Sequence, residues 1–201
     1  MTAQPASRKL TLADIADQRA YERERDGYRA SVLEIRGRRR VAIGTVMSLS
    51  FESRETIRYQ IQEMARAEKL TSDADIQIEL DTYNPLVPES GHLCATLFLE
   101  LTSNDQLREW LPRLVGIERH VVIRLADGTQ IRSAPEAQHA SQLTREHVTS
   151  AVHYLTFDFD QSQIEAFSAG GATLVIDHPQ YTDETALARS TVDELTSDLR
   201  S

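Results

Sequence analysis

The segment 51–69, Phe-Glu-Ser-Arg-Glu-Thr-Ile-Arg-Tyr-Gln-Ile-Gln-Glu-Met-Ala-Arg-Ala-Glu-Lys, constrains the fold more than any other part of the chain. It predicts the end of a strand that continues into a helix with two distinct faces. Ser53 is placed to cap this helix by accepting a hydrogen bond from a free backbone amide. The apolar residues recur at helical spacing and form a single stripe: Ile57, Ile61, Met64 and Ala65. We therefore expect the helix to pack this stripe on a sheet.

The composition is that of a globular protein. The chain has 201 residues, of which 40% are hydrophobic and 26% are charged. Its one cysteine, Cys94, excludes an intrachain disulfide and any thiolate-rich zinc or iron–sulfur site. No apolar run approaches the roughly 18–20 residues of a membrane helix, and the N-terminus lacks the apolar core of a signal peptide. We expect a cytoplasmic protein without membrane insertion.

The net charge of -9 is unevenly distributed along the chain. Residues 1–40 carry a balance of +4, and the remainder carries -13. The basic run Arg-Gly-Arg-Arg-Arg at 36–40 suggests nucleic-acid binding. The favoured interpretation is a solvated helix end, because cations suit a helix C-terminus and the rest of the molecule would repel a polyanion. We predict no specific binding to nucleic acid.

Periodicity and turn signals predict an α+β fold, with a mainly antiparallel sheet of about six strands and helices on one face and at the ends. Residues 1–9 are expected to form a disordered leader and residues 10–201 a single α+β domain. The expected helices are 11–16, 21–38, the helix that begins at Arg54, 73–83, a short helix capped by Asn104, 161–168 and 184–199. The expected strands are 41–51, 93–101, 119–125, 129–133, 148–159 and 172–177. Asp127-Gly128 predicts a hairpin turn, and residues 135–147 are read as helix or loop.

The chain lacks the common catalytic signatures, including a phosphate-binding loop, a Gly-x-Ser-x-Gly elbow and a His-Glu-x-x-His helix. Glu136 and His139 form a Glu-x-x-His pair, which on a helix places both groups on one side, as di-iron sites require. Such sites use two of these pairs with two further glutamates, and only one pair is present. Chance is the favoured explanation for this pair, and a metal site is the alternative.

His153 is the most informative histidine, because it shares the apolar face of its strand with Leu155 and Phe157. A histidine that points into a core must be hydrogen-bonded and is commonly neutral. A structural role is favoured, and a metal ligand or proton donor is the alternative. Glu63 lies at the margin of the apolar stripe of the helix that begins at Arg54. If that helix packs on the sheet face with Leu155 and Phe157, Glu63 and His153 converge on one partly buried polar site.

Several blocks of the sequence resemble an uncharacterised bacterial family catalogued as domain of unknown function 3501. They are Leu-Thr-Leu-Ala-Asp-Ile at 10–15, Tyr-Glu-Arg-Glu-Arg at 21–25, residues 38–44, 51–64, 79–85, 95–100 and 152–155. The resemblance extends from about Leu10 to Leu187. It implies a bacterial cytoplasmic protein encoded near genes for rubrerythrin-like proteins and iron–sulfur oxidoreductases.

Two hypotheses for the function follow. The first is an accessory or protein-interaction factor for a redox system of the rubrerythrin or iron–sulfur oxidoreductase type, with a redox protein as its partner. The alternative is a metal-binding protein or metalloenzyme that holds iron or zinc with histidine and carboxylate ligands. The sequence leaves open whether the protein is an enzyme.

Overall fold

The computed structural model describes residues 7–138, 144–145 and 147–201. Its helices are α1 (Gln18–Arg39), α2 (Arg54–Glu68), α3 (Asp73–Tyr83), α4 (Asn104–Arg113), α6 (Gln161–Ala169) and α7 (Arg189–Arg200), with short 3-10 turns at Leu12–Asp14, Asn84–Leu86 and Ile117–Arg119. The strands are β1 (Arg40–Ile43), β2 (Met47–Phe51), β3 (His92–Leu99), β4 (Val121–Arg124), β5 (Gln130–Arg132), β6 (Ala134–Pro135), β7 (Thr144–Arg145), β8 (Val148–Thr149), β9 (Val152–Asp158), β10 (Thr173–His178) and β11 (Tyr181–Ala186). The fold is α+β, as the sequence predicts.

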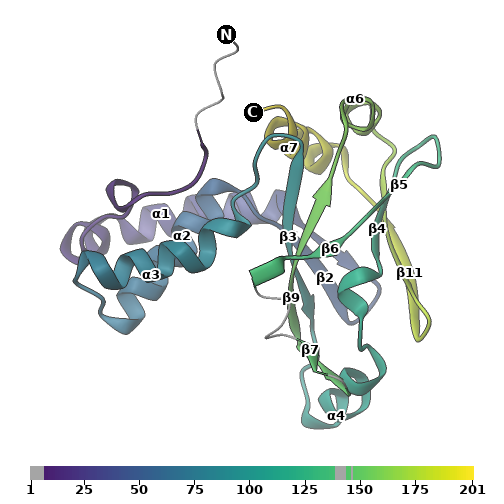
Figure 1. Ribbon diagram of the computed structural model, residues 1–201, viewed down its shortest axis with the longest axis horizontal. Helices are drawn as coiled ribbons and strands as arrows, with labels where there is room; N and C mark the ends of the chain where they lie inside the picture. Colours follow the sequence, from purple (N-terminus) through teal and green to yellow (C-terminus); the bar gives the residue numbers. More distant parts are fainter. Residues whose placement is uncertain (1–6, 139–143, 146) are drawn as a thin grey trace.

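The strands are divided between two main antiparallel sheets (Figure 1). The larger sheet has the order β1-β2-β3-β9-β6, the smaller has the order β11-β10-β4-β5, and β7 and β8 pair separately. The chain passes from β5 to β6 through Ser133, so one edge of the smaller sheet continues directly into the larger one. At the opposite edge, Thr185 of β11 donates a hydrogen bond to the Ala42 carbonyl of β1.

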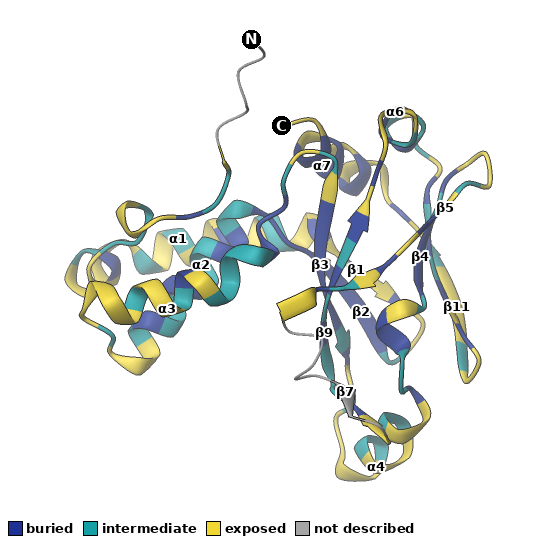
Figure 2. Cartoon of the chain, in the orientation of Figure 1, coloured by how far each residue is buried: buried dark blue, intermediate teal, exposed yellow. Residues whose placement is uncertain are grey.

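The inward faces of the two sheets enclose one apolar core. Both sheets contribute alternate residues to it, for example Leu97 and Phe157 from the larger sheet and Ile123 and Leu174 from the smaller. Figure 2 shows buried residues in dark blue on both sheets, most fully on β3 and β4. The two sheets therefore form a sandwich.

Helices α1, α2 and α3 form a layer beside the outer face of the larger sheet (Figure 1). Ile57 and Ile61 of α2 pack with Leu80 and Leu86 in a second, smaller cluster, and Tyr154 of β9 borders it. Tyr154 alternates with His153 and Leu155 along β9, so this cluster lies on the side of the sheet away from the sandwich core. The expectation that α2 packs on the face with Leu155 and Phe157 is wrong, because those two side chains point into the sandwich.

Several predicted elements match the structure closely. Ser53 caps α2, where its side chain accepts from the Thr56 amide at 3.2 Å. The strands on either side of Asp127-Gly128 pair as an antiparallel hairpin. Helix α1 is continuous through Gly27. None of the described helices is both long and apolar enough to cross a membrane.

Three predicted elements differ from the structure. The expected strand 148–159 is divided into β8, which pairs with β7, and β9 of the larger sheet. The expected strand 41–51 is a hairpin of β1 and β2, in which Ile43 pairs with Met47. Gly44 in the turn has φ +60° and lies against the Tyr181 and Asp183 side chains, which leave no room for a Cβ atom. The first turn of the expected helix 184–199 belongs instead to the edge strand β11, and the helix begins only at Arg189.

Candidate functional site

A pocket of about 410 Å³ lies between α1, α2 and the outer face of the larger sheet. Its floor comes from β2, β3 and β9, and its roof comes from the C-terminal part of α1 and the first half of α2. The start of β1, the end of α3 and the 3-10 turn Asn84–Leu86 complete its walls. The lining includes Arg36, Arg40, Ser50, Glu52, Ile57, Gln60, Tyr83, Leu86, Thr96, Phe98, Val152 and Tyr154. Aromatic and apolar walls with a few charged groups are typical of small-molecule sites.

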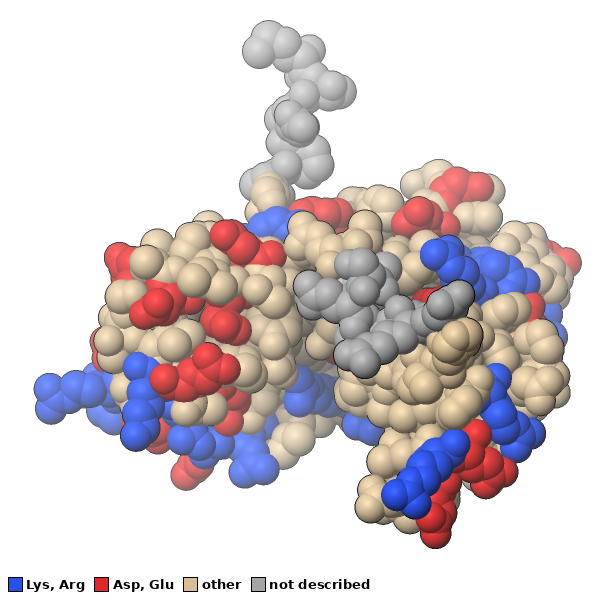
Figure 3. Space-filling model, turned by 60° about the horizontal axis from the view of Figure 1, so that its bottom comes forward, with Lys and Arg blue, Asp and Glu red and all other residues tan. Residues whose placement is uncertain are grey.

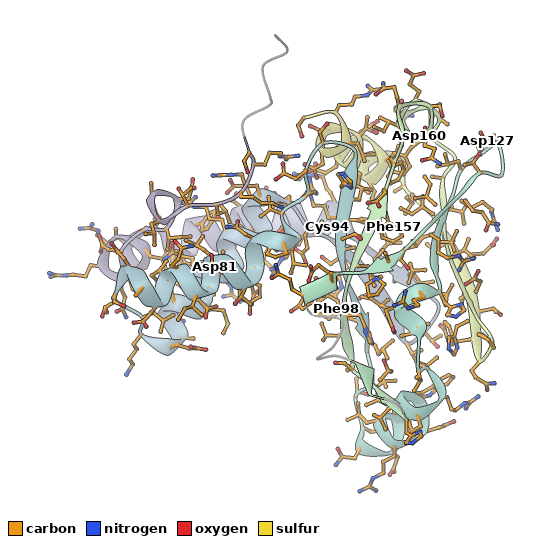
Figure 4. The ribbon with its side chains drawn as sticks, viewed as in Figure 1. Asp81, Cys94, Phe98, Asp127, Phe157 and Asp160 are labelled. Carbon is orange, nitrogen blue, oxygen red and sulfur yellow. The ribbon has the colours of Figure 1, made fainter. Side chains whose placement is uncertain are left out.

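The register of the sheet orders the floor of this pocket. Phe98 of β3 pairs with Val152 of β9, and two residues back Thr96 pairs with Tyr154. Figure 4 shows Phe98 and Cys94 along β3, beside Phe157 on β9. Alternate residues of one strand are about 7 Å apart on the same face. The pocket floor therefore has two pairs of neighbouring residues, Phe98 with Val152 and Thr96 with Tyr154, about 7 Å apart along the strands.

The Phe98 end of the pocket carries positive charge. The Arg40 guanidinium lies 5.0 Å from the centre of the Phe98 ring and pairs with Glu100 at 2.8 Å. The Arg36 guanidinium lies 5.4 Å from the centre of the Tyr59 ring. No described carboxylate lies within ion-pair distance of Arg36, so its charge remains available to a bound anion.

The Thr96 end of the pocket carries a buried carboxylate. Glu52 is 7% exposed, and its two carboxylate oxygens accept hydrogen bonds from the Thr96 and Thr56 hydroxyls, each at 2.6 Å. Burial raises the pKa of the nearby Tyr154 phenol, and Tyr83 and Glu52 raise it further. Burial also raises the pKa of the Tyr83 phenol. The Tyr83 and Tyr154 phenols are therefore protonated at neutral pH and are able to donate hydrogen bonds.

The arginine run 36–40 has a different role from that of a solvated helix end. Arg39 is buried, and it pairs with Asp198 at 2.6 Å and with Glu194 at 3.1 Å on α7. Arg38 also pairs with Glu194. Charged side chains of both signs are interspersed on the face that Figure 3 shows. The run therefore divides between an anchor for α7 and the wall of the pocket.

Glu63 lies in an ion-pair network between α2 and α1. Its carboxylate accepts from both Nε and Nη2 of Arg25, each at 2.8 Å, and from the Tyr21 hydroxyl at 2.7 Å. The Arg25 guanidinium is the main reason that the pKa of Glu63 falls to about 2. This geometry joins the two helices, and all of these partners belong to the helical layer.

His153 lies inside the sandwich, on the other side of the larger sheet. It is 2% exposed, and its Nε2 atom lies 2.9 Å from both the Ser150 carbonyl and the Thr149 hydroxyl. Its Nδ1 atom is 3.9 Å from Glu118, whose Oε2 atom is buried without a hydrogen-bond partner. Burial lowers the pKa of His153, and Glu118 opposes this effect. The structure does not bring His153 and Glu63 together.

The remaining candidates are placed as follows. Glu136 is buried, and its carboxylate accepts from the Gln138 amide at 3.1 Å. His139 lies outside the described residues. Within the part of the chain that the structure describes, no group of three His, Cys, Asp or Glu residues is placed to hold a metal ion. Burial raises the pKa of the Cys94 thiol to about 12, which favours the buried structural role over a reactive thiol.

The pocket residues Arg36, Arg40 and Glu52 are missing from the sites that the sequence predicts. Arg36 lies in the last turn of α1 and Arg40 is the first residue of β1, so the junction of helix and strand brings them to one pocket, and helical spacing does not signal it. Glu52 is recognisable in sequence only as an acidic residue near the start of a helix. Its approach to Thr96, 44 residues further on, depends on the pairing of β2 with β3.

The architecture defines an α+β protein with a β-sandwich, a helical layer and a pocket between them. Residues 9–199 match the family described as "Protein of unknown function (DUF3501)", so the chain belongs to this family. The predicted resemblance is thereby confirmed.

One similar solved structure is the crystal structure of a novel protein of unknown function from Burkholderia pseudomallei. It is 37% identical to this chain, with a TM-score of 0.86, and the match covers 95% of this chain and 99% of the other. No curated protein matches the sequence.

Proposed function

We propose that this protein binds a small organic anion in the pocket between α1, α2 and the larger sheet, and that it acts as an accessory protein through this binding. The observation that carries the proposal is the pair of arginines on one pocket wall. Arg36 has no carboxylate partner among the described residues, and Arg40 reaches over the Phe98 ring. Guanidinium groups bind carboxylates and phosphates with paired hydrogen bonds.

The pocket is also built for a molecule with an apolar body. Phe98, Tyr83 and Val152 supply apolar surface between the charged groups. A volume of about 410 Å³ lies within the range of known metabolite pockets. These features support an organic anion over an inorganic ion.

A direct test compares three proteins: the wild type, Arg36→Gln and Arg23→Gln. Arg23 is an exposed residue of the same helix that does not line the pocket, so its substitution is a control for the change in charge. Each protein is equilibrated with a bacterial polar-metabolite extract, and bound compounds are identified by mass spectrometry. We expect the wild type and Arg23→Gln to retain the same anions and Arg36→Gln to retain them at least about tenfold less. If Arg36→Gln retains the same anions as the wild type, or if no anion is retained, the proposal is wrong.

For the accessory role we propose a redox partner of the rubrerythrin or iron–sulfur oxidoreductase type, which the family resemblance supports. The partner proteins of the same bacterium are purified and titrated against this chain by calorimetry, with and without the captured anion. We expect saturable binding that changes when the anion is present. The absence of binding at about 100 μM partner would contradict this part of the proposal.

A further inference from the structure

We infer that the ligand of this pocket is a zwitterion of the amino-acid type, whose anionic group faces Arg36 and Arg40 and whose ammonium group faces Glu52. The inference rests on the proposed function, because it uses the same pocket. It adds a second recognition group at the opposite end of the site. It thereby names the chemical class of the ligand.

Glu52 is the residue that carries the inference. A buried carboxylate is costly unless a cation or strong hydrogen bonds compensate its charge. Thr96 and Thr56 each donate one hydrogen bond to Glu52, but no described Lys, Arg or His lies within ion-pair distance of it. Arg39, the nearby buried arginine, donates to the Glu52 backbone carbonyl and pairs with Asp198 and Glu194 instead.

The free capacity of Glu52 matches an ammonium group. Each carboxylate oxygen has two lone-pair directions, and the threonines use one on each oxygen. An ammonium group has three donors, so it is able to bond the carboxylate and a neighbouring phenol together. Tyr154 lines the same pocket and lies close enough to Glu52 for the carboxylate to raise its pKa. A ligand ammonium would supply the positive charge that the described residues do not.

The order of charges along the floor determines the orientation of the ligand. Arg40 lies over Phe98, and Glu52 bonds Thr96, which is two residues away on the same strand. The residues that these two groups contact, Phe98 and Thr96, are thus one step of about 7 Å apart along β3. This step suits a compact molecule with both charges near one end of an apolar body. The aromatic walls at Phe98, Tyr83 and Tyr154 would enclose that body.

The test uses matched triads of small molecules with the intact wild-type protein. Each triad contains an amino acid, the acid that lacks the amine and the amine that lacks the carboxylate. The first triad is L-phenylalanine, 3-phenylpropionate and phenethylamine, and triads based on leucine, tyrosine and methionine follow. Binding is measured by calorimetry at pH 7. In at least one triad we expect the amino acid to bind at least about tenfold more tightly than either single-charge analogue.

Glu52→Gln assigns the effect to the carboxylate. This variant keeps the shape of the side chain and removes its charge. We expect it to weaken binding of the amino acid at least about tenfold and to leave binding of the acid nearly unchanged. Glu68→Gln, at an exposed position of α2 outside the pocket, is the control. The thermal unfolding midpoint of each variant is measured first. If Glu52→Gln does not fold, the triads measured with the wild-type protein decide the inference by themselves.

The outcomes separate this inference from the proposed function. If the acids bind as tightly as the amino acids, or if Glu52→Gln retains amino-acid binding, the zwitterion inference is wrong and the anion site stands. If no triad member binds while the metabolite extract yields an anion without an amine, the zwitterion inference is wrong and the proposed anion site still stands. If neither the triads nor the extract yields a ligand, both fail.

Discussion

The sandwich and the helical layer are held together in different ways. The sandwich core consists of apolar side chains from both sheets and from α6 and α7, many of them fully buried, such as Leu97 and Phe157. The apolar cluster of the helical layer is smaller, and polar links supplement it. Examples are the Arg25–Glu63 pair and the Arg54–Asp14 pair at 2.6 Å. In addition, the Gln62 side chain accepts a hydrogen bond from the Ala16 amide and donates one to the Ala16 carbonyl.

This difference explains where the pocket forms. A close-packed interior leaves little space between facing layers. The helical layer touches the sheet where α1 lies beside β2, and also near the start of α2, where Ile57 and Leu86 pack beside Tyr154. Beyond these contacts, Arg36 of α1 and Gln60 of α2 face the sheet residues Phe98 and Tyr154 across a pocket of about 410 Å³. The function is therefore expected at the boundary of the two regions.

The largest expected effect comes from the sandwich. Phe157→Ala removes a fully buried ring that packs 6.2 Å from the Phe51 ring, measured between centroids. We expect the free energy of unfolding to fall by about 3–5 kcal/mol, because the cavity cannot close in a rigid core. Urea denaturation followed by circular dichroism measures the change. Leu33→Ala, at an exposed position of α1, should cost less than about 0.5 kcal/mol.

The helical layer should respond locally. Ile61→Ala removes a fully buried side chain from the smaller cluster, and we expect a cost of about 2–4 kcal/mol. If the two regions are separate in stability, hydrogen exchange will accelerate in α1, α2 and α3 and remain slow in β3 and β9. Equal acceleration in both regions would show that they unfold as one unit.

Glu63→Gln tests the polar links of the helical layer. Arg25 lowers the pKa of Glu63 to about 2, from an ordinary value of 4.5. The stabilisation is therefore fully present above about pH 5, and it is lost as the pH falls through 4.5 towards 2. We expect the variant to be less stable than the wild type by about 1–2 kcal/mol at pH 7, since solvent screens the partly exposed pair.

The pH profile separates this explanation from a loss of packing. Unfolding is measured at pH 7, 5, 4 and 3 for the wild type, Glu63→Gln and the exposed control Glu68→Gln. The difference between the wild type and Glu63→Gln should shrink steadily below pH 5. A difference that is constant with pH would mean that the charge of Glu63 contributes nothing. A more stable variant would favour a functional role for Glu63.

Local signals predicted the elements that depend on local chemistry. The Ser53 cap, the stripe with Ile57 and Ile61, and the Asp127-Gly128 hairpin all follow from residues near one another in sequence. The hairpin at Gly44 was missed because both Ile43 and Met47 point inward, so the alternation of apolar residues continues through the turn. Strand β11 was missed because its Thr-Asp-Glu-Thr sequence is polar, as an edge strand in solvent allows.

The candidate site was less predictable than the fold. Which side of a sheet a helix covers depends on the sheet order, and the sequence does not show that β9 belongs between β3 and β6. The assignment of α2 to the wrong face of β9 therefore joined Glu63 to His153. The same error concealed the outer-face surroundings of α2: Tyr154 borders its apolar cluster, and the Glu52 carboxylate links Thr56 of α2 to Thr96. A pocket lined by residues of four strands and three helices requires the complete topology.

The smallest expected effect on stability is that of Arg36→Gln. This variant tests whether a residue of the pocket wall contributes to binding rather than to the stability of the helical layer. Arg36 contributes a ring contact with Tyr59, and no described carboxylate pairs with it. Arg36 is half-buried, and a cation–π contact at an exposed site is worth about 0.5–1 kcal/mol. Glutamine retains part of the side-chain contact. We therefore expect the free energy of unfolding to change by less than about 0.5 kcal/mol, while retention of the captured anion falls at least about tenfold. Urea denaturation of the ligand-free protein measures the first quantity, and dialysis with mass spectrometry the second. A loss of stability as large as that of Ile61→Ala would instead make Arg36 a structural residue of the helical layer.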